Sequence, residues 1–223
     1  MIWIAKGTSS PEKQGPLHLA MFEERKRIFV DLLRWNVPVR SGRYEIDQFD
    51  DEHATYVIVE DGQGQHLGSA RLLPTLRPHI LDTLFPHLTD AQILRDRETF
   101  EITRFCLSAR ITAAERRGVR RALVSAIAVY AAGWGVKCYT GVAEQRWFDE
   151  IAKFGWDCEP LSVASPSSSE RLVAFRIRIT DQTIARLRRT GIFMDISLNM
   201  LPANARPASD LFQLQPEETY HAA

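Results

Sequence analysis

Hydrophobic residues in the first fifty positions change from strand spacing to helix spacing. Met1–Ala5 predicts a short strand, and a loop rich in Gly, Ser, Pro and Lys follows at Gly7–Pro16. Pro16–Trp35 predicts a helix, because its apolar side chains recur every three or four positions. The polar stretch Val39–His53 is expected to be a loop.

The remaining pattern alternates strands with helices. Tyr56–Glu60 and Leu67–Pro74 are spaced as a hairpin. Apolar residues from Val119 to Trp134 recur at alternating intervals of three and one, which is the stripe of a long amphipathic helix. Further elements are expected in this order: a strand at Thr99–Leu107 before the long helix, then a strand at Lys137–Val142, a helix at Gln145–Phe154, a strand at Arg171–Ile179, and a helix at Thr180–Thr190 with Thr180 as its N-cap.

This order predicts an α/β protein, a three-layer sandwich around a mixed twisted sheet. A chain of 223 residues suits one large domain, and 45% hydrophobic and 25% charged residues are close to globular averages. We expect a single domain over residues 1–200, with an N-terminal lid segment at about 7–50. Residues 201–223 contain several Pro and Glu and are expected to be a loosely packed or disordered tail.

Charge and cysteine content argue against several classes of protein. Lys plus Arg equals Asp plus Glu at 28 each, and this zero net charge argues against nucleic-acid binding by the whole surface. The three cysteines lack metal spacing and are odd in number, so we expect buried thiols in a reducing cytoplasm. No membrane span or secretory signal is expected, because no apolar run approaches 18 residues.

One basic segment suggests an anion site. The motifs GxSxG, HExxH, GxGxxG and the Walker loop are absent, and the six histidines show no metal spacing. The run Ala114–Ala122 lies at the predicted start of the long helix, where free N–H groups and arginines favour anions; a solvated helix start is the alternative. The run resembles the pyrophosphate loop of the N-acetyltransferase fold, but Glu115 and Arg120 depart from it and do not suit a complete coenzyme A cradle.

Charged residues also occupy positions where the core pattern predicts none. Buried charges persist only when they are paired, so these residues are expected to meet in a cleft and neutralise one another. For each residue taken singly, an ordinary surface ion pair is the alternative. Strict alternation would put Glu101 and Arg104 on opposite faces of their strand, so a shared site requires a bulge or a splay of the strand. The set comprises Arg25, Glu45, Asp47, Asp50, Arg71, Glu101 and Arg104.

The same residues resemble the sequence pattern of the acyl-homoserine-lactone synthases, the autoinducer synthases of bacterial quorum sensing. Arg25 and Phe29 have the Arg-x3-Phe spacing, Trp35 follows six residues later, and Glu45–Asp50 fits Glu-x-Asp-x-aromatic-Asp. Leu32 departs from the pattern, because the family usually has Lys, Arg or Gln there. Two further family blocks are matched by Gly68–Pro74 and Glu98–Arg104.

This resemblance implies a fold like that of the N-acetyltransferases, with no metal and no cofactor. It implies two substrates, S-adenosylmethionine and an acyl thioester on acyl carrier protein or coenzyme A. The α-amine would attack the thioester to form an amide, and the methionine carboxylate would then displace methylthioadenosine and close the lactone. We expect the carrier protein to be the preferred donor, and we expect no nucleic-acid partner.

The resemblance, together with amine chemistry, assigns roles to the charged residues. A free α-amine has a pKa near ~7.8 and must lose a proton before it attacks, and Glu101 is the candidate acceptor. Asp47 and Asp50 would hold the ammonium and sulfonium groups. Arg71 and Arg104 would orient these carboxylates. A lid over S-adenosylmethionine, with Trp35 offering a flat face, is expected to comprise Arg25, Phe29, Trp35 and Glu45.

Two larger sets are expected to bind the acyl donor. An apolar tunnel for the acyl chain would be formed by Phe105, Leu123, Ile127, Tyr139, Thr140, Gly141, Val142 and Trp147, although for each one plain core packing is the more frequent role. Thr140 or Gly141 falls where the family uses a hydroxyl or a small residue to select a 3-oxo group. A basic surface for the carrier protein or its pantetheine arm would comprise Arg110, Arg116, Arg117, Arg120, Arg121, Arg146 and Lys153.

Two other functions remain open at the level of sequence. A general N-acetyltransferase using acetyl-coenzyme A would share the fold, but it would need an intact pyrophosphate loop, and Arg120 argues against one. A non-enzymatic protein that binds an acidic partner or nucleic acid would use the arginines and leave the four acidic residues of the set unexplained. The acyl group and the oligomeric state also remain open.

Overall fold

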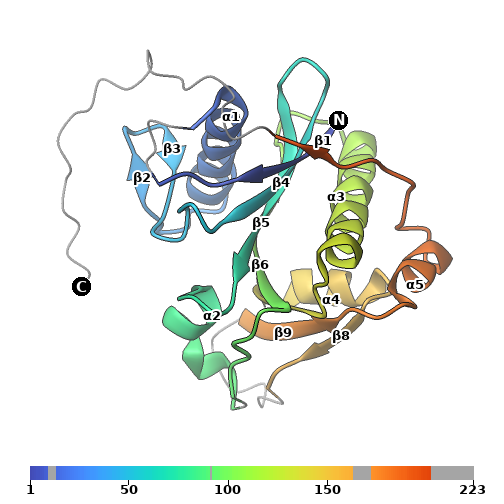
Figure 1. Cartoon of the computed structure of the whole chain (residues 1–223). Helices are drawn as coiled ribbons and strands as arrows, with labels where there is room; N and C mark the ends of the chain where they lie inside the picture. The colour runs from blue at the N-terminus through green and yellow to red at the C-terminus, as the bar shows by residue number, and fades with distance from the viewer. Residues whose placement is uncertain (10–13, 91, 163–171, 202–223) are drawn as a thin grey trace.

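An eight-stranded mixed sheet forms the centre of the computed structural model, which describes residues 1–9, 14–90, 92–162 and 172–201. The strands are β1 (Ile2–Lys6), β4 (Thr55–Glu60), β5 (His66–Pro74), β6 (Thr99–Leu107), β7 (Cys138–Glu144), β8 (Asp157–Pro160), β9 (Leu172–Arg178) and β10 (Asn199–Met200). Their order is β10-β1-β4-β5-β6-β7-β9-β8 (Figure 1). Neighbours are antiparallel, except that β1 is parallel to β10 and β6 is parallel to β7.

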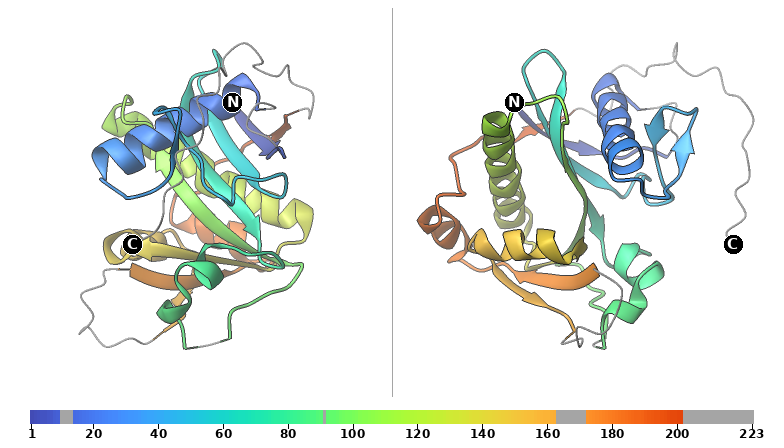
Figure 2. Two further views of the ribbon diagram at one scale, coloured as in Figure 1. Left: turned by 90° about the vertical axis from the view of Figure 1, so that its left-hand side faces the viewer. Right: turned by 180° about the vertical axis from the view of Figure 1, so that it is seen from behind.

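Helices cover both faces of the sheet (Figures 1 and 2). One face carries α1 (Pro16–Arg25), its continuation as the π-helix η2 (Lys26–Leu32), α2 (Ile80–Thr83), the 3-10 helix η3 (Pro86–Leu88) and the small hairpin of β2 (Val39–Arg40) and β3 (Tyr44–Glu45). The other face carries α3 (Ala113–Trp134), α4 (Gln145–Lys153) and α5 (Thr183–Arg189). A buried apolar cluster lies against each face. The predicted three-layer α/β sandwich is therefore confirmed.

Local signals determine both ends of α3. Thr112 is the N-cap: its Oγ1 accepts a hydrogen bond from Glu115 N (3.3 Å), and the Glu115 carboxylate accepts one from Thr112 N (2.7 Å). Gly135 ends the helix with a φ of 73°, which glycine adopts without strain. The helix expected from the apolar stripe is confirmed, and its start at Ala113 places the basic run inside the helix.

Several expected elements differ in the structure. Val39–His53 is not wholly a loop, because β2 and β3 pair within it. The helix expected at Thr180–Thr190 begins at Thr183, and its N-cap is Gln182 rather than Thr180. The elements β8, β10 and α2 were not predicted, because each has four residues or fewer and shows no periodicity.

Other sequence expectations have mixed outcomes. All three cysteines are free, but only Cys106 is buried, and Cys138 and Cys158 are half-buried. No helix in the described ranges is long and apolar enough to cross a membrane. Apart from Leu201, the expected tail lies outside the described residues.

The sheet opens between β6 and β7. These parallel strands pair from Thr99 with Cys138 to Ile102 with Gly141, but β6 continues to Leu107 and β7 to Glu144. Beyond the last pair, the two strands no longer share a ladder, so side chains from both faces of the sheet can line one space. This opening positions the candidate active site.

Candidate active site

A bulge in β6 turns two consecutive side chains to the same face of the sheet. β6 gains one residue relative to β5 just after the pair Arg71–Thr103. Arg104 has a φ of 50°, a left-handed conformation that costs energy for a residue other than glycine. As a result, Thr103 and Arg104 both bond to groups on the α1 side, whereas Phe105 contacts Trp147 of α4 on the other. The bulge predicted for this strand is confirmed.

Arg25 joins α1 to the loop that follows β3. Its Nε donates to Glu45 Oε2 (2.6 Å), and its Nη1 and Nη2 donate to the two oxygens of Asp50 (both 2.8 Å). All three side chains are buried, and the Tyr56 hydroxyl also donates to Asp50 (2.8 Å). Arg25 and Glu45 therefore form a buried ion pair beneath the expected lid and do not lie on its surface.

Arg71 and Arg104 complete this ion network. Arg71 donates to both oxygens of Asp47 (2.6 and 3.0 Å) and lies 2.8 Å from an oxygen of Asp50. Arg104 donates to Glu45 (2.9 Å) and Asp47 (2.8 Å). Together with Arg25, these residues give three arginines and three carboxylates in mutual contact, so the charges balance. Six of the seven charges expected to meet therefore pair in one buried network, whereas Glu101 forms no ion pair in the described residues.

Solvent reaches this network mainly at one side chain. The Arg104 side chain is 10% exposed, whereas those of Asp47 and Asp50 are 4% and 0% exposed. Burial alone would raise the pKa of Asp50, but Arg25 and Arg71 hold it well below its usual range. Asp50 is thus an ionised structural partner of the arginines. Within the described part of the chain, no group of three or more His, Cys, Asp or Glu side chains could hold a metal ion.

Glu101 is buried beside this network and is held by backbone groups. The amide of Ile80 donates to Glu101 Oε2 and that of Leu81 donates to Oε1, both at 2.7 Å. These amides are the first two of α2 and have no partner within the helix, so the carboxylate satisfies them. Burial raises the pKa of Glu101 to about 7, although both amides and the charge of Arg71 favour its ionised form. A carboxylate with this pKa can accept and release a proton near neutrality.

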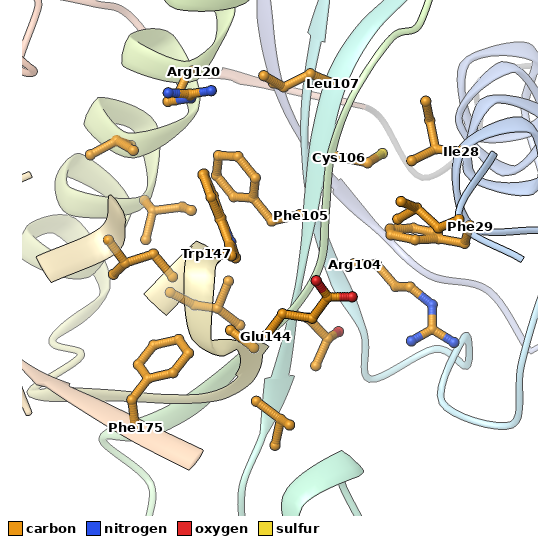
Figure 3. A pocket seen from close by; sticks show the side chains of 18 of the residues that line it. Ile28, Phe29, Arg104, Phe105, Cys106, Leu107, Arg120, Glu144, Trp147 and Phe175 are labelled. Atoms are coloured by element: carbon orange, nitrogen blue, oxygen red, sulfur yellow. The ribbon is translucent and has the colours of Figure 1, made fainter. Parts of the chain in front are cut away.

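A cavity of about 370 Å³ passes through the opening between β6 and β7. Figure 3 shows Phe29 and Arg104 on one side of β6, and Phe105, Trp147 and Arg120 on the other. Because residues from both sides of β6 line the cavity, it links the exposed edge of the ion network to the space between α3 and α4. Most of the cavity wall is apolar, so the cavity can hold an extended apolar group.

The structure divides the expected acyl-tunnel set in two. Phe105, Ile127, Val142 and Trp147 line the cavity. Leu123 and Tyr139 are core residues instead; both are fully buried away from the cavity, and the Tyr139 hydroxyl donates to the carbonyl of Ile127 (3.1 Å).

Thr140 and Gly141 do not line the cavity either, and they differ in their surroundings. Thr140 pairs in register with Glu101, and its buried hydroxyl has no hydrogen-bond partner in the described residues. A Cβ at Gly141 would come within 2.7 Å of the Phe175 ring, so only glycine fits there without displacing that ring. The sequence did not single out the remaining apolar lining, which includes Val124, Ile151, Phe154, Trp156, Phe175 and Ile177.

The expected basic residues differ in their surroundings. Arg116 and Arg120 line the cavity, and Arg120 lies over the Trp147 ring at 5.4 Å. Arg110 instead forms an ion pair with Glu24 of α1 (2.9 Å), and Arg121 reaches the carbonyl of Phe193 (3.5 Å). The others are exposed, namely Arg117, Arg146 and Lys153, of which Lys153 pairs with Glu150.

Most amides of the basic run are already hydrogen-bonded. The amide of Glu115 donates to the Thr112 hydroxyl (3.3 Å), that of Arg116 bonds to the carbonyl of Thr112 (2.9 Å), and the following amides lie inside α3. From Glu115 onward, therefore, only the arginine side chains of this run are available to an anion.

Two aromatic residues stand at the mouth of the cavity. Phe29 and Trp35 stack with ring centroids 4.8 Å apart, and the Arg104 guanidinium lies 5.6 Å from the centre of Phe29. Leu32 and Leu33, next to them in η2 and just after it, are exposed apolar residues that also line the cavity. Phe29 and Trp35 of the expected lid therefore lie beside Arg104 of the ion network, and their role as a lid stays a prediction.

Comparisons with known proteins identify the fold and the family of this chain. An acyl-CoA N-acyltransferase from Pseudomonas aeruginosa has the same fold, with a TM-score of 0.52 and 14% identity over 79% of this chain and 98% of that chain. The sequence model described as autoinducer synthase matches residues 13–187. The chain therefore belongs to the autoinducer synthase family, whose members are acyltransferases.

Individual relatives agree with this assignment. An acyl-homoserine-lactone synthase of Ralstonia nicotianae is 35% identical over 130 residues, which are 55% of this chain and 63% of that protein. The solved structure of MesI, a CoA-dependent acyl-homoserine lactone synthase, is 29% identical with a TM-score of 0.74, over 89% of this chain and 98% of that chain. TofI, solved with an inhibitor and MTA, is also 29% identical, with a TM-score of 0.68 over 84% of this chain and 96% of that chain.

Proposed function

We propose that this protein makes an N-acyl-L-homoserine lactone from S-adenosylmethionine and an acyl thioester. The observation that carries the proposal is the cavity, which begins at Arg104 of the balanced ion network and continues into an apolar space. One end suits a charged substrate and the other suits an acyl chain. The MTA bound to TofI agrees with methylthioadenosine as the second product.

Glu101 is the proposed proton acceptor. The α-amine of S-adenosylmethionine is mostly protonated below a pKa of ~7.8, and Glu101, with a pKa of about 7, can take up that proton directly or through water. The freed amine attacks the thioester carbonyl carbon, and an amide bond forms as the C–S bond of the thioester breaks. The nitrogen loses a second proton in this step, and that proton leaves on the sulfur of the thiol. The methionine carboxylate then attacks the carbon next to the sulfonium, and the C–S bond breaks to release neutral methylthioadenosine.

The remaining charged residues divide into contact and positioning roles. Arg104 is the exposed member of the network and is placed to meet the substrate carboxylate or the thioester oxygen. Asp47 is the proposed contact for the ammonium and sulfonium charges. Asp50, Arg25 and Arg71 are enclosed, so we assign them the role of holding Asp47 and Glu45 in place.

The acyl chain would lie in the cavity between α3 and α4. Phe105, Ile127, Val142 and Trp147 are its proposed contacts, with Phe29 and Trp35 closing the mouth over S-adenosylmethionine. Arg116 and Arg120 are the proposed contacts for the phosphate of the pantetheine arm. Acyl carrier protein remains the favoured donor, and the CoA-dependence of MesI makes acyl-coenzyme A the alternative to test.

The proposal includes no metal or cofactor, because S-adenosylmethionine is consumed as a substrate. A cytoplasmic location and the absence of a nucleic-acid partner stay predictions. A general acetyl-coenzyme A-dependent N-acetyltransferase is the alternative within the fold, but it gives no reason for the buried network of three arginines and three carboxylates.

Incubation of the purified protein with S-adenosylmethionine and a series of acyl carrier proteins and acyl-coenzymes A tests the proposal. Mass spectrometry should detect an acyl-homoserine lactone and an equal amount of methylthioadenosine. Glu101→Gln should lower the rate about 10²–10⁴-fold because the proton acceptor is lost. The exposed Glu98→Gln, three residues away, is the matched control and should keep the wild-type rate. Acetylation of amines without methylthioadenosine would contradict the proposal, and a Glu101→Gln rate within a few-fold of wild type would exclude the acceptor role.

A further inference from the structure

The carboxylate of Glu101 depends on a helix of only four residues. Both of its oxygens accept hydrogen bonds from α2, through the amides of Ile80 and Leu81 at 2.7 Å. A single-turn helix has little stability of its own, so its position requires other contacts. Whatever fixes α2 therefore fixes the orientation of Glu101.

Asp82 is one of the residues that hold α2 in place, besides the buried side chains of Ile80 and Leu81. Its Oδ1 accepts hydrogen bonds from the amide of His79 (2.8 Å) and from the hydroxyl of Thr83 (2.7 Å). Its Oδ2 accepts one from Arg95 Nη2 (2.5 Å). The Asp82 side chain is 4% exposed and that of Arg95 is 61% exposed, so an almost buried carboxylate is neutralised by one surface arginine.

Charged groups act on Glu101 from two of the elements around it. From β5, the positive charge of Arg71 favours the ionised form of Glu101, and from α2 the negative charge of Asp82 disfavours it. From β7, the register partner Thr140 presents an uncharged hydroxyl. His79, the N-cap residue of α2, is fully buried; its Nδ1 lies 2.9 Å from the carbonyl of Arg77 and 3.5 Å from Asp82. Asp82 is thus the like charge that can change the protonation of Glu101.

We propose that Asp82 and Arg95 are positioning residues for Glu101. Asp82 holds the amides of Ile80 and Leu81 against the Glu101 carboxylate. The negative charge of Asp82, partly neutralised by Arg95, sets the pH at which Glu101 gains or loses its proton. This inference rests on the proposed role of Glu101 as proton acceptor. Neither residue needs to touch substrate. Asp82 and Arg95 would bring the pH range in which Glu101 titrates close to that of the substrate amine that Glu101 deprotonates.

Two substitutions should shift this titration in opposite directions. Asp82→Asn keeps an oxygen that can accept from the His79 amide but removes the negative charge, so Glu101 should ionise at lower pH. Arg95→Gln removes the charge that neutralises Asp82, so Glu101 should ionise at higher pH. Shifts of roughly 0.5 unit are expected at an effective dielectric constant of about 20. Simple loosening of α2 would remove amide hydrogen bonds in both variants and raise the pKa in both.

Carbon-13 NMR of protein labelled at the glutamate carboxyl carbon measures the titration directly. Glu101→Gln assigns the resonance by its loss, and Arg97→Gln is the matched control, because Arg97 is exposed and forms no ion pair with the described residues. Opposite shifts in Asp82→Asn and Arg95→Gln, with none in the control, support the proposal. Shifts of the same sign, or no shift in Arg95→Gln, which alters only an exposed side chain, overturn it.

The titration needs no substrate, so its result is independent of lactone synthesis. If the protein makes no lactone, opposite shifts would still establish the charge effect, and the proposed function alone would fail. If lactone forms, the acidic limb of kcat/KM against pH should move with the NMR titration in both variants. An acidic limb that stays at the wild-type pH while the resonance shifts would show that Asp82 and Arg95 do not act on the reaction through Glu101.

Discussion

The imidazole of His66 is buried at the start of β5, and neither ring nitrogen has a hydrogen-bond partner in the described residues. Burial lowers the pKa of His66 to about 4, because the charged form loses its hydration; the nearby Glu24 only partly opposes this. The unfolded chain takes up this proton near pH 6.5, whereas the folded protein does so only near pH 4. Stability from a neutral His66 is therefore complete above about pH 6.5 and is lost as pH falls towards 4.

We predict that His66 accounts for at most about 3 kcal/mol of the unfolding free energy lost between pH 6.5 and 4. His66→Met fills the site without a titrating group, so its unfolding free energy should fall less over this range. Urea denaturation at a series of pH values measures the difference. The control His53→Gln, at a more exposed position, should keep the wild-type slope. Equal slopes for wild type and His66→Met would contradict the prediction.

At the scale of elements, the helix formed by α1 and η2 is anchored at one end and exposed at the other. Glu24 of α1 is buried and accepts hydrogen bonds from the Ser108 hydroxyl (2.9 Å) and the amide of Ala109 (3.0 Å), in the loop before α3. Arg25 anchors the same end through its ion pairs with Glu45 and Asp50. Beyond them η2 has the wider π-helical bonding, with the Leu33 amide bonded to the Ile28 carbonyl, and exposed side chains at its end.

We predict that residues 26–35 exchange their amide hydrogens rapidly in the free protein and more slowly when S-adenosylmethionine binds beneath Phe29 and Trp35. The physical reason is that few buried contacts hold this segment until a ligand covers its apolar face. Hydrogen exchange followed by mass spectrometry measures the change, and α3 serves as the internal control because its buried stripe should be protected in both states. Equal exchange with and without the ligand would mean that η2 is static packing.

At the scale of the whole molecule, a net charge of zero leaves open how charge is distributed over the surface. The exposed Arg117 and Arg146 each lie next to a residue that lines the cavity, on α3 and α4 respectively. A local positive surface there would attract an acidic carrier protein by long-range electrostatics. Coenzyme A would instead rely on short contacts with Arg116 and Arg120.

We predict that kcat/KM for acyl carrier protein falls steeply with salt, because the Debye length shrinks from ~10 Å at 0.1 M to ~3 Å at 1 M. The double substitution Arg117→Glu and Arg146→Glu should lower it at least about fivefold at low salt. Arg189→Glu, on the exposed face of α5, is the matched charge reversal and should have little effect. A better rate with acyl-coenzyme A of the same chain length at low salt, together with unchanged carrier-protein kinetics in the double variant, would show that the carrier protein is not the donor.

Local sequence by itself determined the main elements and the membership of the charged set. The apolar stripe of α3 and the strand spacing of β6 are properties of neighbouring residues, so they can be read without tertiary contacts. The charges at positions where the core pattern predicts none required pairing, because unpaired buried charges are too costly. The need for a bulge in β6 followed from the same requirement combined with the alternation of a strand.

The tertiary structure decided which of these residues share a site and what surrounds them. The cavity exists because β6 and β7 stop pairing after Ile102 and Gly141, and the side chains around it come from α3, α4, β9 and the segment after α4. Tyr139 and Thr140 are adjacent in β7 and face opposite layers: Tyr139 packs in the core and donates to the carbonyl of Ile127 in α3, whereas Thr140 pairs in register with Glu101. Glu101 acquired its amide partners from α2, twenty residues away, a helix too short to show any pattern. Periodicity describes each element by itself, whereas strand pairing and side-chain packing over long sequence separations determine where the elements meet.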